Sequence, residues 1–584
     1  MSSFLPQQDP NPTKRAEELA GNQQEYQYTY DTYVSPLAVL KDLPKSQKPS
    51  FWWLLKAARQ ALTVLTNHID NTLDKKKKNE HRRKRIAFLL ELVTFRAKPE
   101  TILNYVQDSL RESLKAISED RPVSLDDYAN IFRTIGLPPI HKDFKDDRVF
   151  AYMRVAGPNP LVIERISEIP DHFPVTAEMY SDVMVNDSLD AAKAEGRLYL
   201  ADYKALEGLE NGEFQGTPKY LYAPLSLYAV EKGSGQLVPI AIQPEQTPGP
   251  ENPVYTPHSN YDWLIAKTIV QVADGNFHEA ISHLGRTHLF IEPFAVTTYR
   301  QLASNHPVFT LLSPHFEGTM SINESAVNTL IAPGEAVDEV MAPKIESVWE
   351  ATVEGVDTFP VDEMFLPKTF AARGVDNREL LPIYPYRDDS MMYWTAIHDW
   401  VSSYLALYYP SDAEVAGDKE LQNWYRELKA QDGGRVKGLA GDSGSRSYLA
   451  DVLTMVIYTS SVQHAAVNFP QYDLMSYVPN VPGACWCERP TSFGADERKY
   501  LDTLPIMNVA ERQTEFLFLL GTVHYTKLGH YRWFHFDRKV KPHLKKFQKA
   551  IDNINAVIQL KNAERKPLPY TPLIPKGVPQ SINI

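Results

Sequence analysis

Apolar side chains recur at helical spacing near the start of the chain. Between residues 51 and 73 they fall every three or four positions, at Trp52, Leu55, Ala58, Leu62, Leu65, Ile69 and Leu73. This spacing predicts an amphipathic helix with a single apolar face. Pro49 and Ser50 stand directly before the helix, which is typical of a helix start. Residues 1–50 are polar and rich in Pro, Gln and Tyr, and we predict a flexible arm there.

Most of the remaining chain is also patterned as helix. Helical spacing continues over residues 86–117, and from about residue 125 long helical stretches alternate with segments dense in Pro, Tyr and Asp. Strand-like alternation of apolar and polar residues is scarce. The sequence therefore predicts a mainly α protein with three parts: the flexible arm (1–50), a helical N-terminal extension (51–120) and one large helical domain (125–584).

The composition is that of a globular protein with an acidic total charge. Of the 584 residues, 43% are hydrophobic and 23% are charged, and the net charge is −12. An acidic chain has no overall positive electrostatic potential that would attract nucleic acid, so we predict no nucleic-acid partner. The two cysteines, Cys485 and Cys487, are too few for a disulfide framework and indicate a reducing compartment. Since neither a signal peptide nor a long apolar run is present, we expect a cytoplasmic protein.

A basic run follows the amphipathic helix. Against the single acid Glu80 stand eight cations, which give a local charge of +7: Lys75, Lys76, Lys77, Lys78, Arg82, Arg83, Lys84 and Arg85. One interpretation is a helix packed on the rest of the protein and followed by an exposed connector. The other is peripheral membrane docking, in which the basic run attracts anionic lipid and apolar residues enter the headgroup boundary, namely Trp52, Trp53, Leu55 and Leu62. The sequence leaves both open.

Two histidines, His283 and His288, lie five residues apart in a segment with helical spacing. In a regular α-helix, five residues turn through about 500°, which leaves the two imidazoles about 140° apart. A π-bulge would bring them to one face, and such bulges occur mostly at functional sites. Histidines on a helix are also common in cores and on surfaces, so the spacing alone leaves a structural role open.

A second polar pair lies in an otherwise apolar segment. His464 and Asn468 are four residues apart, which places both on one helical face. An unpaired buried polar group costs about 1–3 kcal/mol, so the pair needs partners, either structural ones or a metal. The chain ends in apolar Ile584 behind a Pro-rich segment that could thread the α-carboxylate into the interior, where it would need a cation. Imidazole, amide and carboxylate groups together suit non-haem iron.

Longer stretches of the sequence resemble the lipoxygenase family. Its first iron-binding helix is similar to HLGRTHLFIEPFAV at the start of residues 283–331, and its second is similar to QHAAVNFPQYD (463–473). Further similar stretches are DDRVFAYMRVAGPNP (146–160) and LPIYPYRDDSMMYWTAI (381–397), and the terminal isoleucine matches too. The resemblance covers about residues 145–584. It is to bacterial or cyanobacterial members without the N-terminal β-barrel that often docks lipoxygenases to membranes, a task the helix at 51–73 could take over.

The resemblance implies a metal site and the residues around it. The ligands of a non-haem iron, with manganese as an alternative metal, would be His283, His288, His464, Asn468 and the carboxylate of Ile584. Gln471 would orient Asn468 or a water on the iron. Glu279 stands where plant relatives often have a glutamine, which puts the usual polar link between substrate pocket and iron in doubt.

The resemblance also implies a reaction and a substrate pocket. Enzymes of this family remove a bis-allylic hydrogen from a polyunsaturated fatty acid, such as linoleate or linolenate, and add O2 to form a conjugated hydroperoxide. Leu330 matches the leucine that clamps the pentadiene, and three residues match positions that set channel depth: Val337, Val340 and Met341. Ala326 stands where alanine usually goes with S products, and we expect oxygen at C9 (R) or C13 (S) of C18 substrates.

Two other functions are left open by the sequence. One is a hydroperoxide isomerase of the same fold, and the other is a membrane-binding protein with a relic metal site. The partner of the substrate carboxylate is not predicted, because Val481 replaces an arginine that plant relatives have there.

Overall fold

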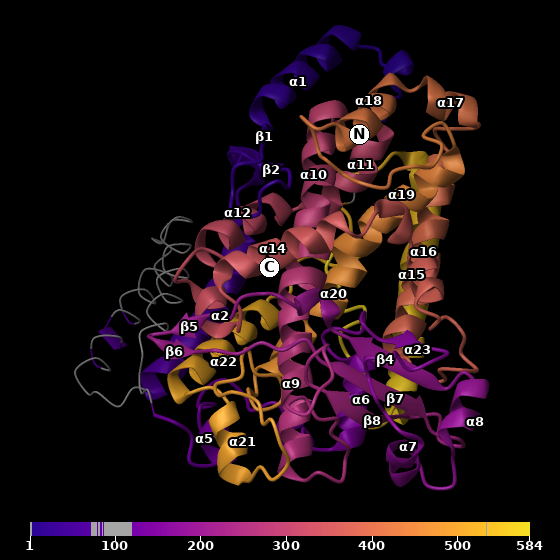
Figure 1. Cartoon of the computed structure of the whole chain (residues 1–584). Helices are drawn as coiled ribbons and strands as arrows, with labels where there is room; N and C mark the ends of the chain where they lie inside the picture. The colour runs from indigo at the N-terminus through magenta and orange to yellow at the C-terminus, as the bar shows by residue number, and fades with distance from the viewer. Residues whose placement is uncertain (1–2, 72–78, 80–81, 84–85, 87–119, 533) are drawn as a thin grey trace.

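A long helical rod runs through the middle of the molecule (Figure 1). The computed structural model describes residues 3–71, 79, 82–83, 86, 120–532 and 534–584. The rod joins α9 (Tyr261–Phe277), the π-helical segment η5 (His278–Leu289) and α10 (Phe290–Gln301) without a break. Most of its residues are buried, as expected of a helix that other helices surround. The predicted mainly α fold is confirmed.

Further helices pack around this rod. The α-helices before and around it are α5 (Leu125–Ala129), α6 (Asp147–Ala156), α7 (Ala177–Val183), α8 (Leu189–Ala194), α11 (Pro307–Leu312), α12 (Thr319–Thr329), α13 (Ala336–Val340), α14 (Ile345–Asp357) and α15 (Leu366–Ala372). Those later in the chain are α16 (Pro385–Leu405), α17 (Asp412–Gly417), α18 (Lys419–Lys429), α19 (Arg446–Tyr458), α20 (His464–Asn468), α21 (Glu497–Thr503), α22 (Met507–Thr522) and α23 (Lys541–Glu564). Short 3-10 turns are η1 (Pro6–Gln8), η2 (Lys45–Gln47), η3 (Pro139–Lys142), η4 (Lys204–Leu206), η6 (Ser313–Phe316), η7 (Val361–Glu363) and η10 (Arg538–Val540).

A four-stranded antiparallel sheet lies at one end of the helical body (Figure 1). Its strand order is β3 (Glu164–Arg165), β4 (Leu198–Asp202), β7 (Leu225–Val230) and β8 (Leu237–Gln243). Every residue of β7 and β8 is buried, so these strands read as continuous apolar runs without alternation. The alternation pattern therefore gave no sign of this sheet. Two hairpins add the strand pairs β1 (Tyr28–Thr29) with β2 (Val39–Leu40) and β5 (Glu213–Phe214) with β6 (Thr217–Pro218).

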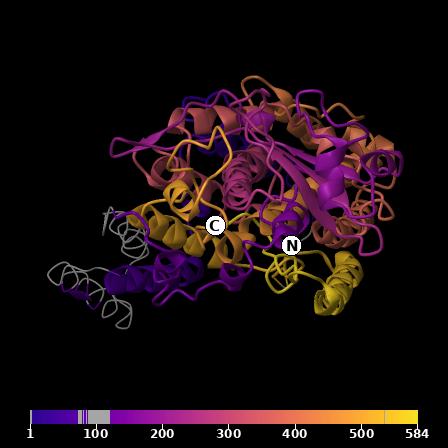
Figure 2. The same ribbon diagram turned by 60° about the horizontal axis from the view of Figure 1, so that its bottom comes forward.

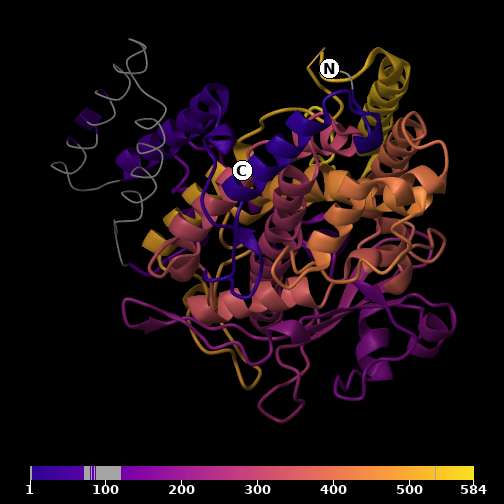
Figure 3. The ribbon, with the colours of Figure 1, turned by 90° about the horizontal axis from the view of Figure 1, so that it is seen from above.

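The N-terminal segment is packed against the helical body, although we predicted a flexible arm for residues 1–50. It contains α1 (Pro12–Glu25), which lies across the body in Figure 3. Arg15 of α1 is 5% exposed and makes a two-pronged ion pair with Glu420 of α18, with nitrogen–oxygen distances of 2.5 and 2.8 Å. Asp9 adds a second ion pair to Arg15 at 2.7 Å. These buried pairs fix the segment, and a polar composition alone does not reveal them.

Helix α2 (Phe51–Asn71) begins where the sequence predicted and lies beside α22 (Figure 2). Two side chains of α2 make hydrogen bonds to this part of the chain. Lys56 donates to the His524 carbonyl just after α22, and Asn71 donates to Glu511 of α22. The buried face includes Ala58, Leu65 and Ile69 of the predicted apolar face, together with Leu54, Ala57, Ala61 and Val64. Most of α2 is thus packed on the protein.

The candidate membrane-docking residues have different surroundings. Trp52 is 69% exposed, whereas Trp53, Leu55 and Leu62 are partly buried. Arg82 and Arg83 are exposed. The other members of the basic run lie outside the described residues: Lys75, Lys76, Lys77, Lys78, Lys84 and Arg85. Within the described part of the chain, no helix combines the length and the apolar character that crossing a bilayer requires.

The C-terminus lies inside the molecule, near its centre in all three views (Figures 1–3). Ile584 is 5% exposed. The approach of the chain is fixed by His315, whose Nδ1 lies 2.7 Å from the Gln580 carbonyl, and by the Thr319 hydroxyl, which donates to the Ile582 carbonyl at 2.9 Å. The predicted return of the C-terminal segment into the interior is confirmed.

Candidate metal centre and substrate chamber

The central rod changes its helical geometry where the two histidines lie. Segment η5 is π-helical over His278–Leu289 and contains both His283 and His288. The wider π turn brings residues five apart to one face. The ring centroids of His283 and His288 lie 5.0 Å apart, and both side chains are buried. The π-bulge hypothesis is confirmed, because a regular α-helix would direct the two rings apart.

A third histidine completes a cluster. His464 is the first residue of α20, directly after a second π-helical segment, η8 (Thr459–Gln463). Its Nε2 lies 3.4 Å from Nε2 of His283 and 3.2 Å from Nε2 of His288. The three imidazoles thus direct the same type of nitrogen at one point, from two helices far apart in the sequence.

The electrostatics of this cluster favour neutral imidazoles. Burial lowers the pKa of all three histidines, and for His288 the value falls to about 3. His283 further lowers the pKa of His288, and both lower that of His464, because adjacent imidazolium charges repel. A neutral imidazole that is protonated at Nδ1 presents a lone pair at Nε2, and three such converging lone pairs fit a bound cation. The nitrogen donors suit non-haem iron.

Asn468 and Ile584 lie next to this cluster. Asn468 donates from Nδ2 to the Leu520 carbonyl at 3.0 Å, and its Oδ1 accepts from Gln471 at 3.3 Å. Gln471 itself begins a third π-helical segment, η9 (Gln471–Met475). The backbone of Ile584 lies close enough to His464 to raise its pKa, and Ile584 lines the same cavity as His283 and His288, so the chain terminus lies beside the three histidines. The structure therefore brings all five predicted ligand residues into one buried region.

An apolar chamber of about 120 Å³ adjoins the histidines. His283, His288 and Ile584 form part of its wall. Four predicted pocket residues line it: Ala326, Leu330, Val337 and Met341. Val340, predicted to set the channel depth, does not, because it packs in the main core against Gly483.

The family model for lipoxygenase matches residues 53–568 of the chain. The chain belongs to the lipoxygenase family. A linoleate 9/13-lipoxygenase from Pseudomonas aeruginosa is 39% identical over 504 residues, which cover 82% of this chain and 73% of that protein. The human hydroperoxide isomerase ALOXE3 is 35% identical over 497 residues, which cover 83% of this chain and 69% of that protein.

A solved structure shows the same fold. An anaerobic crystal structure of a lipoxygenase deletion variant in complex with arachidonate has a TM-score of 0.86 and 28% identity, and the match covers 100% of this chain and 84% of that one. Lipoxygenases are iron-dependent dioxygenases that act on polyunsaturated fatty acids, and this lipoxygenase is an enzyme of that class.

Glu279 of the lipoxygenase lies between the chamber and His283. Its carboxylate lines the chamber and lies 3.3 Å from Nδ1 of His278 and 3.4 Å from Nδ1 of His283. Burial alone would raise the pKa of Glu279, but the two histidines outweigh this effect and lower it to about 2. Gln471 reaches the same Nδ1 of His283 at 3.2 Å. Both residues predicted to act beside the metal therefore contact His283.

The sequence reasoning missed the residues that hold His288. Asn323 of α12 accepts from Nδ1 of His288 at 2.8 Å and donates to Glu292 at 2.8 Å, and Glu292 accepts from the Leu40 backbone at 2.7 Å. Burial raises the pKa of Glu292 to about 7. Such outer partners fix the tautomer and orientation of a ligating histidine. Glu292 lies four residues after His288 in the central rod, and this spacing, which places two side chains on one helical face, could have indicated it.

Proposed function

We propose that this lipoxygenase converts linoleate, or a similar polyunsaturated fatty acid, to a conjugated hydroperoxide, at an iron held by His283, His288, His464, Asn468 and the Ile584 carboxylate. The observation that carries the proposal is the convergence of three buried imidazoles beside an apolar chamber, which His283 and His288 line. Bound iron supplies the redox chemistry for removing a bis-allylic hydrogen. We further propose that the chain consists of an N-terminal extension followed by a catalytic domain that begins at about residue 125.

The side chains of the chamber have separate tasks in this proposal. Leu330 packs against the pentadiene and holds it toward the histidine wall, while Val337 and Met341 limit how far the chain enters. The apolar lining excludes water and so protects the carbon radical that hydrogen removal creates. Glu279 and Gln471 hold the ring of His283. Ala326 leaves room for O2 on one face of the radical, which gives 13S or 9R products according to the direction of the bound chain.

The proposal predicts a direct spectroscopic result. The iron-loaded enzyme mixed with dispersed linoleate is expected to consume O2 and to form one conjugated diene per O2, because oxygen adds at an end of the pentadienyl system. The absorbance of the conjugated diene measures product formation, and an oxygen electrode measures O2 consumption. Chiral chromatography then assigns the position and the stereochemistry of the hydroperoxide. Iron-loaded protein that consumes no O2 with linoleate, linolenate or arachidonate would refute the proposal.

A hydroperoxide isomerase is the second candidate function, because the human relative at 35% identity has that name. The two functions differ in their substrate. An isomerase turns over a fatty acid hydroperoxide faster than the parent acid and consumes no O2. Comparing both rates on one enzyme preparation separates them.

We also propose that the exposed N-terminus of α2 docks at a membrane surface. The Phe51 and Trp52 side chains are 42% and 69% exposed and pack edge to face, with ring centroids 5.8 Å apart. Interfacial aromatic residues favour the headgroup region. Anionic lipid would also attract the basic run that follows α2.

Substituting Trp52→Ala is therefore expected to weaken binding to anionic liposomes by at least about tenfold, because a large apolar side chain contributes about 1.5–3 kcal/mol when buried. Flotation of the full chain with liposomes measures this. Leu560→Ala, which removes a 73% exposed side chain on α23, serves as the control. Equal flotation of wild type and Trp52→Ala would contradict membrane docking at this surface.

A further inference from the structure

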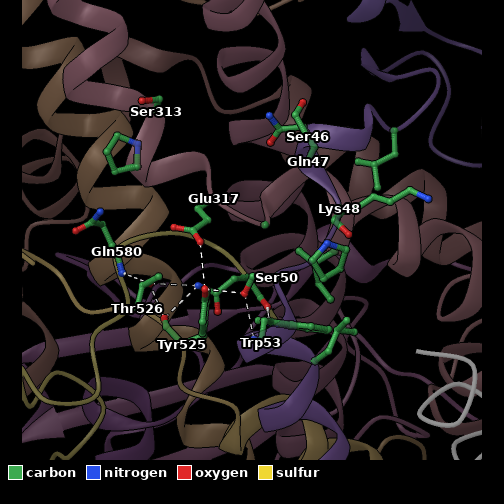
Figure 4. Close-up of a pocket in the computed structure, with 18 of the residues that line it drawn as sticks. Ser46, Gln47, Lys48, Ser50, Trp53, Ser313, Glu317, Tyr525, Thr526 and Gln580 are labelled. Carbon is green, nitrogen blue, oxygen red and sulfur yellow. Dashed lines mark hydrogen bonds between the residues drawn. The ribbon is translucent and has the colours of Figure 1, made fainter. Parts of the chain in front are cut away.

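A second, larger cavity adjoins the substrate chamber. We call it the vestibule; it has a volume of about 1040 Å³ and is shown in Figure 4. Four residues line both spaces: Trp53 of α2 and Ile322, Ser325 and Thr329 of α12. The three α12 residues are spaced by three and four and share one helical face. The boundary between vestibule and chamber is therefore formed by one tryptophan on one side and one face of α12 on the other.

Trp53 is fixed at both its backbone and its ring. Its backbone N–H donates to the Ser50 hydroxyl at 3.1 Å, and its indole N–H donates to the Asn583 carbonyl at 2.6 Å. Ser50 in turn contacts the Tyr525 hydroxyl at 2.7 Å (Figure 4). Hydrogen bonds to Ser50 and to Asn583, the residue before Ile584, thus fix the position of the indole.

The two spaces differ in size and in chemistry. The chamber, at about 120 Å³, is well below the roughly 300–1,000 Å³ of a pocket that encloses a whole ligand of drug size. A long acyl chain must therefore extend past Trp53 into the vestibule. The vestibule is lined by three cations, Lys48, Lys527 and Arg532, as well as by two carboxylates, Glu317 and Glu324. An ionised carboxylate is costly to bury in an apolar space, so the polar end of the substrate stays in the vestibule.

We propose that Trp53 is a specificity-determining residue: it separates the polar vestibule from the apolar chamber and sets how far an acyl chain enters. The inference rests on the proposed function, because the depth of entry decides which bis-allylic carbon lies beside the histidine cluster. The methyl end and the pentadiene occupy the chamber, and the carboxyl end lies on the vestibule side of the indole.

Arachidonate tests this inference because it offers three bis-allylic carbons. Replacing Trp53→Ala removes the boundary, so the chain is expected to bind at several depths, and the ratio of the main positional hydroperoxide to the next is expected to fall about fivefold or more. Trp53→Phe keeps a ring but loses the hydrogen bond to Asn583, and a smaller fall in the same ratio is expected. Leu560→Ala is the control: this 73% exposed side chain of α23 lines neither cavity, and the wild-type ratio is expected.

The products are separated by chromatography on enzyme of matched iron content and thermal midpoint. If Trp53→Ala does not fold, Trp53→Phe alone decides the question. Wild-type product ratios in both folded Trp53 variants would overturn the inference while leaving the proposed function in place. A wild-type enzyme that forms no hydroperoxide would refute both.

Discussion

The His464→Ala enzyme is expected to lose most of its iron and at least about a thousandfold of its rate of hydroperoxide formation, since a metal contributes several kcal/mol to such a reaction. His464 is the one member of the histidine cluster that does not come from the central rod, and its Nε2 lies within 3.4 Å of both other Nε2 atoms. Alanine leaves two imidazoles from η5 and no nitrogen opposite them.

Metal analysis of the purified protein and the diene assay measure the two effects. A second histidine variant, His398→Ala, is the control, because His398 is partly exposed and pairs with Asp451 away from the cluster. That variant is expected to keep its iron. A His464→Ala protein with full iron content would show that the cluster is not the metal site.

Arg15→Ala is expected to lower the free energy of unfolding by about 3–5 kcal/mol, because it leaves two buried carboxylates without their cation. The side chains of Asp9 and Glu420 are 3% and 9% exposed. Urea unfolding of the full chain measures the change. Arg148→Ala is the matched control: its ion pair with Glu231 is 36% exposed on both sides, so about 0–1 kcal/mol is expected. If Arg15→Ala lowered the free energy of unfolding no more than Arg148→Ala does, the N-terminal segment would not be held by these ion pairs.

The same ion pairs predict a pH dependence. Burial alone would raise the pKa of Asp9, but its hydrogen bonds and the charge of Arg15 outweigh this and lower the value from 3.8 to about 2. A carboxyl group whose pKa is lower in the folded state than in the unfolded state stabilises the folded state at every pH above its unfolded-state pKa. The contribution of Asp9 is therefore fully present above about pH 4 and is lost as the pH falls toward 2.

Local patterns predicted the parts of the structure that depend on local chemistry. The start of α2 follows from Pro49 and Ser50, and the mainly helical fold follows from apolar spacing. The π-helical turn at His283 and His288 was one of two options that the spacing left open, and only the three-dimensional structure decides between them. The ligand set itself came from a resemblance to a family, because no periodicity joins residues 283, 464 and 584.

Other features depend on contacts between distant segments, which no local pattern encodes. The polar segment of residues 3–50 is held to the helical body by Arg15, whose partner Glu420 lies 405 positions later. One of the two interpretations of the sequence placed Trp53 at a membrane surface with Trp52. In the structure Trp52 is 69% exposed, whereas Trp53, the next residue of α2, lines both cavities. Val340 shows the same limit, since its match to a pocket position did not reveal that Gly483 lets it pack into the core.

The buried C-terminus has a consequence for how the enzyme is made. The α-carboxylate of Ile584 lies inside the protein, on the wall of the chamber. His283 and His288, which lie far earlier in the sequence, form the same wall, so this wall closes only after the C-terminal segment has been synthesised. An affinity tag attached after Ile584 would extend from a residue that is only 5% exposed and would disturb the packing around it. An affinity tag is therefore better placed at the other end of the chain.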